Sequence, residues 1–329
     1  RLPPETCCQL GLTGVNPTNT VKRVKTLLAE LREDSNLDAL ARYIDFESDL
    51  YRQHGRVTYF ADEYLIDIFT DTTERAPTFK TPPFRSALDT QAPAPWAFVK
   101  DPLRKTKNAW LNVLEHHPRC LTWTPDDYRQ MNASQQIIAN PPQVSEELLY
   151  TFMIGCEADA SRTEVSPNAA VAVLVGSEDA HLNPKADAWK EAFDQQTTSY
   201  DTRKSLVVSS NTIDDPNVFA IKVALPRSPL NLFAHLGIKL VLNNLSTAIM
   251  GKIGRLSSNW MAHVEASNKK LIDRSARLIS ELGQVDYRTA CIALYETMDE
   301  MVSWSEEKRK TISPAAYAVE KIMAARNAK

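Results

Sequence analysis

An uninterrupted apolar run from Ala169 to Val175, AAVAVLV, places the tightest constraint on how this chain can fold. A strand that is apolar on both faces belongs inside a sheet that is covered on both sides, as parallel sheets are. Strand and helix patterns alternate around this run, which favours βαβ units and a doubly wound, mostly parallel α/β fold. We expect strands at residues 55–61, 169–175, 205–209 and 218–225, helices at residues 21–31, 37–51, 62–69, 106–114, 144–154 and 186–193, and a proline-containing loop at residues 72–83.

Composition excludes several functional classes. The net charge of −3 offers no electrostatic basis for binding nucleic acid. The apolar run at residues 230–250 contains His235, Lys239 and Asn243, which are too polar for a bilayer span. The five cysteines are scattered and show no metal-ligand spacing, which fits reduced thiols in the cytoplasm. We therefore expect a cytoplasmic protein without a nucleic-acid or membrane partner, a cofactor or a metal.

The segment from Lys239 to Arg274 combines a long helix with the start of a second one. Apolar residues recur in it at three- and four-residue steps, which predicts a helix with a wide apolar face. Asn243, Asn244, Ser246 and Thr247 interrupt this face, and a buried helix tolerates such groups only where their hydrogen bonds are accepted. Ser267 or Asn268 is a good N-cap for the second helix.

This segment resembles the end of the sugar isomerase (SIS) domain in N-acetylmuramic acid 6-phosphate etherases and in the glucokinase regulatory protein. The family pattern is close to K-x-V-L-N-x-x-S-T, followed by G-(K/R), N-x-M and (S/T)-N-x-K-L. The matching residues are Lys239, Leu242, Asn243, Ser246, Thr247, Gly251, Lys252, Asn259, Met261, Ser267, Asn268, Lys270 and Leu271. Residues 55–79 are also similar to a family motif, through Asp71, Glu74, Pro77, Thr78 and Phe79.

The resemblance covers residues 20–300 and is weakest between residues 90 and 165. It implies a flavodoxin-like SIS domain with N-terminal helices and a C-terminal helical cap. We expect an irregular arm at residues 1–20, the α/β domain at residues 21–282 with a helical and irregular insert around residues 90–165, and the cap at residues 283–329.

An SIS domain holds a phosphosugar with backbone N–H groups and Ser/Thr hydroxyls where strands meet helices. Here all three expected loops, at residues 61–65, 177–182 and 228–235, depart from the family pattern. The first two carry carboxylates, Asp62–Glu63 and Glu178–Asp179. At roughly 4 Å and an effective dielectric of about 20, each would repel a phosphate charge by about 4 kcal/mol. Our default interpretation is that these carboxylates, with Asp214–Asp215, are solvated loop tips; a cation site is the alternative.

Seven residues are candidates for the site. Ser177, Ser209 and Ser210 end strands, where phosphate ligands would lie. The resemblance implies that the segment of Asn268, Lys269 and Lys270 reaches a sugar phosphate, often one in a neighbouring SIS domain; the alternative is an N-cap with solvated lysines. Glu74 matches the general acid of the etherases, which needs a raised pKa to donate a proton. Its alternative is a structural carboxylate. The second catalytic glutamate is not found, and Glu115 is only a loose candidate.

These observations leave the question of enzyme activity open. Our first hypothesis is a non-catalytic SIS module that pairs with a second SIS domain, in the same protein or in a homodimer. Together they would form a sugar-phosphate-binding or regulatory protein resembling the glucokinase regulatory protein. The alternative is an amino-sugar-phosphate lyase or isomerase with Glu74 as general acid, and a purely structural dimerisation module comes third. The sequence does not identify the ligand or the partner.

Overall fold

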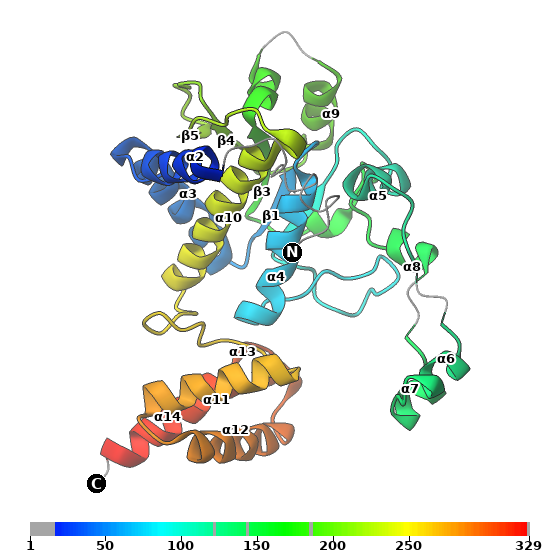
Figure 1. The fold of residues 1–329 in the computed structure, drawn as a ribbon, viewed down its shortest axis with the longest axis vertical. Coiled ribbons are helices and arrows are strands. Elements are labelled where there is room, and N and C mark those ends of the chain that lie inside the picture. Colours follow the sequence, from blue (N-terminus) through cyan, green and yellow to red (C-terminus); the bar gives the residue numbers. More distant parts are fainter. Residues whose placement is uncertain (1–16, 121–122, 143–144, 184–186, 328–329) are drawn as a thin grey trace.

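A five-stranded, entirely parallel sheet with helices on both faces forms the centre of the computed structural model, which describes residues 17–120, 123–142, 145–183 and 187–327 (Figure 1). The strand order is β2-β1-β3-β4-β5. The strands are β1 (Arg56–Phe60), β2 (Ala97–Lys100), β3 (Asn168–Val175), β4 (Thr202–Ser209) and β5 (Val218–Lys222). All four strand pairings are parallel, which confirms the predicted doubly wound α/β class.

Strand β3 is buried along its whole length because both of its faces pack against helices. Val171, Val173 and Val175 belong to the core shared with the N-terminal helices. Ala170, Ala172 and Leu174 face the other way, onto Trp189 and Phe193 of helix α9 (Ala188–Gln196). The continuous apolar run thus serves two cores, one on each side of the sheet.

Four helices cover the first face: α2 (Pro17–Glu30), α3 (Asp34–Arg52), α4 (Leu65–Phe79) and α10 (Leu232–Lys252). Helix α10 packs between α3 and α4, and its predicted apolar face is buried. Two sequence predictions were wrong here. Residues 17–20 are not part of an irregular arm but the first turn of α2, where Pro17 suits the first helical position; residues 1–16 lie outside the described residues.

The second error concerns α4, which continues to Phe79 although a loop was predicted from residue 72. Proline usually ends a helix, but the tertiary packing of α4 overrides Pro77. Asp71, Arg75 and Phe79 lie on one helical face and are all buried.

The insert between β2 and β3 is mostly irregular. It contains helices α5 (Thr106–Leu114), α6 (Pro125–Gln130), α7 (Gln135–Ala139) and α8 (Glu146–Tyr150). Helices α6 and α7 form an arm that projects from the body, at the lower right of Figure 1. Helix α8 is shorter than the predicted helix at residues 144–154, because the chain turns so that the Ile154 carbonyl accepts the Asp101 N–H. Residue 144 is outside the described residues. Strand β2 was not predicted.

The C-terminal helices form a separate core of their own. They are α11 (Lys269–Gly283), α12 (Tyr287–Val302), α13 (Glu306–Thr311) and α14 (Pro314–Asn327). Leu278, Ile279 and Leu294 are fully buried in this core. The predicted division between domains at residue 282 stays a prediction. Helix α11 precedes that residue in the sequence, but it packs with α12 and α14 in the C-terminal core.

Candidate functional site

The candidate site lies at the carboxyl ends of the strands. In an open α/β sheet ligands bind where neighbouring strands lead to connections on opposite sides, and here that point lies between β1 and β3. Helix α4 follows β1 on one face, and α9 follows β3 on the other. The loops at residues 61–64 and 176–178 therefore meet at this crevice.

A carboxylate of the protein itself occupies this crevice. Glu178 accepts the backbone N–H of Glu63 at 3.1 Å through Oε1 and that of Val175 at 2.9 Å through Oε2. Only 9% of the residue is exposed. The Glu63 N–H belongs to the loop at residues 61–65, where the family resemblance predicts a phosphate. Glu178 therefore occupies a backbone donor that an anion bound at this loop would need.

The Glu178 carboxyl holds its proton unusually well. Burial raises its pKa from the ordinary 4.5 to about 7, and the nearby charges of Asp62 and Glu63 act in the same direction. The two backbone N–H bonds lower the pKa but do not cancel these effects. Glu178 is therefore a buried group that titrates near neutral pH, which corrects our interpretation of it as a solvated loop tip.

The other carboxylates at this edge also have partners. Arg104 donates to Asp62 at 2.6 Å and to Asp101 at 2.8 Å. Asn231, in the short helix η3 (Pro229–Asn231), donates to Glu63 at 2.6 Å. Asn211 donates to Asp179 at 2.6 Å. Among the described residues, no group of three or more His, Cys, Asp or Glu side chains is placed to hold a metal ion.

The three candidate serines differ in their surroundings. Ser177 is exposed in the short helix η2 (Gly176–Leu182). Ser209 is buried at the end of β4, where its hydroxyl accepts the Asn211 N–H at 3.2 Å. Ser210 is exposed and lines a cavity with Lys22 and Arg23 of α2. The contribution of α2 to this edge was not foreseen, since it depends on how α2 packs.

Glu74 lies elsewhere, in the middle of α4. It is nine residues past the start of that helix, or about 14 Å along its axis. Its side chain is 64% exposed and forms an ion pair with Lys239 of α10, with 3.6 Å between Oε2 and Nζ. Glu74 therefore lies next to a buried network of charged side chains around Arg75, and away from the candidate serines.

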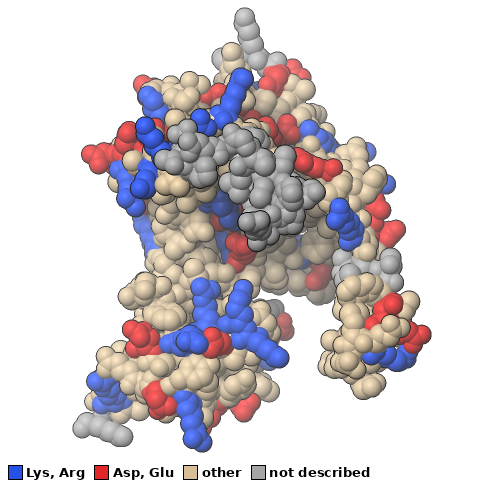
Figure 2. Space-filling view, in the orientation of Figure 1, with Lys and Arg blue, Asp and Glu red and all other residues tan. Residues whose placement is uncertain are grey.

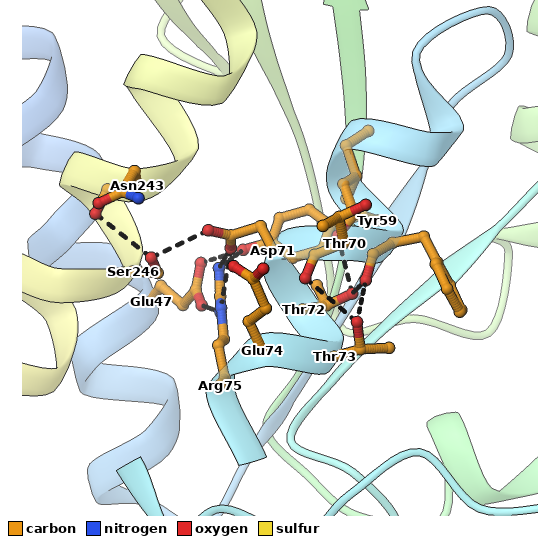
Figure 3. Close-up of polar contacts among 12 residues, drawn as sticks. Glu47, Tyr59, Thr70, Asp71, Thr72, Thr73, Glu74, Arg75, Asn243 and Ser246 are labelled. Atoms are coloured by element: carbon orange, nitrogen blue, oxygen red, sulfur yellow. Dashed lines mark hydrogen bonds and ion pairs between the residues drawn. The ribbon is translucent and has the colours of Figure 1, made fainter. Parts of the chain in front are cut away.

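That network joins α3, β1, α4 and α10 around one guanidinium group (Figure 3). Arg75 contacts Glu47 at 2.6 Å and Asp71 at 3.0 Å, and all three side chains are at most 5% exposed. Ser246 donates to Asp71 at 3.0 Å, so the polar interruption of the α10 face has its acceptor. Tyr59 donates to Glu47, and burial strongly raises the pKa of its hydroxyl.

Burial also raises the pKa of Asp71, although the Arg75 charge opposes this effect. The neighbouring Glu74 belongs to the exposed rim of the network rather than to its buried part. The close-up view shows the same arrangement, with Arg75 directed at Glu47 and Asp71 (Figure 3).

Asn268, Lys269 and Lys270 lie at the opposite end of the sheet. The Asn268 side chain accepts the Leu271 N–H at 3.0 Å and caps α11, as predicted, and both lysines are exposed. The nearby Glu265 N–H bonds to the Pro77 carbonyl near the end of α4, which points away from the strand tips. The predicted sugar-phosphate residues are thus split between the two edges of the sheet. Lys and Arg side chains gather on the C-terminal helices where they face the α/β body (Figure 2).

The fold and these loops define a doubly wound α/β protein. Comparison with known proteins finds similarity to one kind of enzyme. No family model matches the chain. It is similar to N-acetylmuramic acid 6-phosphate etherases over short stretches. One from Oceanobacillus iheyensis is 52% identical over 52 residues, 16% of this chain and 18% of that protein. One from Synechococcus sp. is 47% identical over 58 residues, 18% of each protein.

A third, from Listeria monocytogenes serotype 4b, is 41% identical over 88 residues, 27% of this chain and 29% of that protein. The matches thus span less than a third of the length of these relatives. Helix α10 is the one described helix that is long and apolar enough to cross a membrane, and half of its most apolar window is buried in the protein. Its packing between α3 and α4 is typical of a core helix.

Proposed function

We propose that this chain is a sugar-phosphate-binding protein of the SIS type that does not turn its ligand over. The observation that carries the non-catalytic part of the proposal is the position of Glu178, whose carboxylate takes the backbone donors of Glu63 and Val175 at the β1–β3 crevice. The similarity to N-acetylmuramic acid 6-phosphate etherases supports the sugar-phosphate part. An incoming phosphate would have to displace this buried group and also meet the charges of Asp62 and Glu63. A crevice closed in this way lacks the cradle that sugar-phosphate chemistry needs.

The proposal includes a second SIS domain, in the same protein or in a second copy of this chain. The lysines at positions 269 and 270 lie at the far end of the sheet from the chain's own strand tips. Their exposure at a capped helix N-terminus suits an anion carried by a neighbouring domain. We also propose that the protein is located in the cytoplasm.

A second candidate is an amino-sugar-phosphate lyase, and the names of the relatives favour it. In this candidate Glu74 is the general acid. The geometry supports it less well, because Glu74 is paired with Lys239 and Glu115, the only loose candidate for the second carboxylate, sits at the C-cap of α5. An elimination needs a general base to remove a proton as well as a general acid to protonate the leaving group, and the family's second glutamate is not found among the described residues.

One assay separates the two candidates. The protein is incubated with N-acetylmuramic acid 6-phosphate, lactate is measured, and thermal unfolding is recorded in parallel. Our first proposal predicts stabilisation, about 2.7 kcal/mol at a hundredfold excess over Kd, without lactate. Lactate release that Glu74→Gln abolishes, while Glu191→Gln on the exposed side of α9 leaves it unchanged, would establish the lyase instead.

A further inference from the structure

A second depression at the carboxyl edge of the sheet stays open. It has a volume of about 570 Å³ and lies between helix α2, the tip of β4 and the segment that follows β5. Its lining residues are Lys22, Arg23, Thr26, Ser210, Ala224, Leu225 and Pro226. The Glu178 side chain that closes the β1–β3 crevice is not among them.

Three contacts fix α2 over this depression. Leu27 is 1% exposed and belongs to the main core. Glu30 accepts the backbone N–H of Ala224 at 2.7 Å. Asn36, in the first turn of α3, donates to the Glu30 carbonyl at the end of α2 and to the Lys222 carbonyl, both at 2.8 Å, and accepts the Lys222 N–H at 2.7 Å. The helix is therefore tied to the end of β5, and this attachment holds Lys22 and Arg23 at the cavity wall.

The cavity is locally positive. Among the described residues, neither Lys22 nor Arg23 forms an ion pair with a carboxylate; Arg23 only lies over the Phe233 ring, at 5.8 Å. Glu30, the one acid of α2, accepts the Ala224 N–H and does not line the cavity, so its single negative charge leaves the two cations in excess. The β1–β3 crevice differs in this respect, because there the cation Arg104 is paired with the carboxylate of Asp62. Two unpaired cations beside the Ser210 hydroxyl favour an anionic ligand that accepts hydrogen bonds.

The remaining wall is apolar. Ala224, Leu225 and Pro226 offer carbon surface next to the cations. A ligand with a charged end and a ring face would use both parts of such a cavity, whereas a bare inorganic anion would use only the cations.

We propose that this cavity binds a sugar phosphate, with Lys22 and Arg23 on the phosphate, Ser210 donating to it, and Leu225 and Pro226 against the sugar ring. The proposal rests on the proposed function and assigns its ligand to a site other than the β1–β3 crevice. In this arrangement α2 becomes part of the binding site rather than only a cover for the sheet.

Calorimetric titration with N-acetylglucosamine 6-phosphate tests this assignment. We expect Lys22→Gln with Arg23→Gln to weaken binding at least tenfold, which is about 1.4 kcal/mol. Ser210→Ala should weaken it less. Lys25→Gln is the matched control, since Lys25 is an exposed cation of the same helix that does not line the cavity, and it should change Kd less than twofold. Circular dichroism confirms that each variant is folded.

The outcomes distinguish the site from the function. Binding that the Lys22→Gln, Arg23→Gln variant retains would overturn the site and leave the proposed function standing. If the unmodified protein binds no sugar phosphate, the proposed function fails and inorganic phosphate becomes the probe. Phosphate binding that the same variant loses would then support an anion site here, and phosphate binding that it retains, or none, would overturn it.

Discussion

Glu178 is a glutamate whose charged form the fold disfavours. It is buried at the point where β1 and β3 lead to opposite sides of the sheet, and it accepts two backbone N–H groups there. Its folded pKa of about 7 lies above the ordinary value of 4.5, so the folded protein holds this proton more tightly than the unfolded chain does. This contribution to stability is complete below pH 4.5 and is lost as the pH rises through 7.

Replacing Glu178 with glutamine removes this titration while keeping the size of the side chain. As the pH rises from 4.5 to 8, the unmodified protein should lose stability that Glu178→Gln keeps. The free energy of unfolding of the variant should therefore rise relative to that of the unmodified protein. The shift in pKa sets an upper limit of about 3 kcal/mol for this gain. Urea unfolding at a series of pH values measures it, with the exposed Glu191→Gln as control. Parallel stability curves for Glu178→Gln and the unmodified protein would show that Glu178 titrates normally.

The role of Glu178 could not be predicted from the sequence, for a physical reason. Its partner N–H at Glu63 is 115 residues away in the chain, and nothing local to the sequence GSEDAHL says that this carboxylate is covered. Ser246 was different. A hydroxyl on an apolar helical face requires a partner, so the sequence indicated that one exists, and the fold supplies Asp71.

At the scale of elements, the Arg75 network fastens α4 to α3 and β1. The guanidinium group of Arg75 is held by Glu47 and Asp71, both nearly inaccessible to water. Removing one partner of such a cluster leaves uncompensated buried charge, which costs far more than the loss of an exposed ion pair. The same face of α4 keeps the helix intact past Pro77.

We therefore expect Arg75→Met to lower the free energy of unfolding by about 3–5 kcal/mol. Arg129→Met is the control, because Arg129 pairs with Asp126 of the same helix, α6, while 57% exposed, and such a pair is worth about 1 kcal/mol or less. Urea denaturation of both variants gives the comparison. Equal effects would mean that the buried network does not hold the helices together.

The elements show where sequence patterns suffice. The Asn268 cap was predicted with its observed role, because an asparagine just before an apolar-periodic run is a local signal. Helix α5 was also predicted with its observed bounds, Thr106–Leu114, although no side chain caps its N-terminus. Strand β2 was missed because it is only four residues long, which gives too short a run for a periodic pattern, although prolines stand on both sides of it. Helix α4 was cut short because the cost of a proline is visible in the sequence and the burial that offsets it is not.

For the whole molecule, the α/β body and the C-terminal helices are joined at the amino edge of the sheet. The Lys80 side chain donates to the Ile312 carbonyl, and the Glu265 N–H bonds to the Pro77 carbonyl. The candidate residues at positions 268–270 lie at this edge, and the candidate serines lie at the other. A single chain therefore does not bring its predicted sugar-phosphate residues together, which is why the proposed function includes a second domain.

The central claim is that Glu178 closes the β1–β3 crevice to phosphate. A crystal structure determined with N-acetylmuramic acid 6-phosphate tests it most directly. We predict that Glu178 still accepts the N–H groups of Glu63 and Val175, and that ligand density, where present, lies away from these loops. A phosphate held between the Asp62 and Ser177 loops, with Glu178 displaced, would contradict the claim.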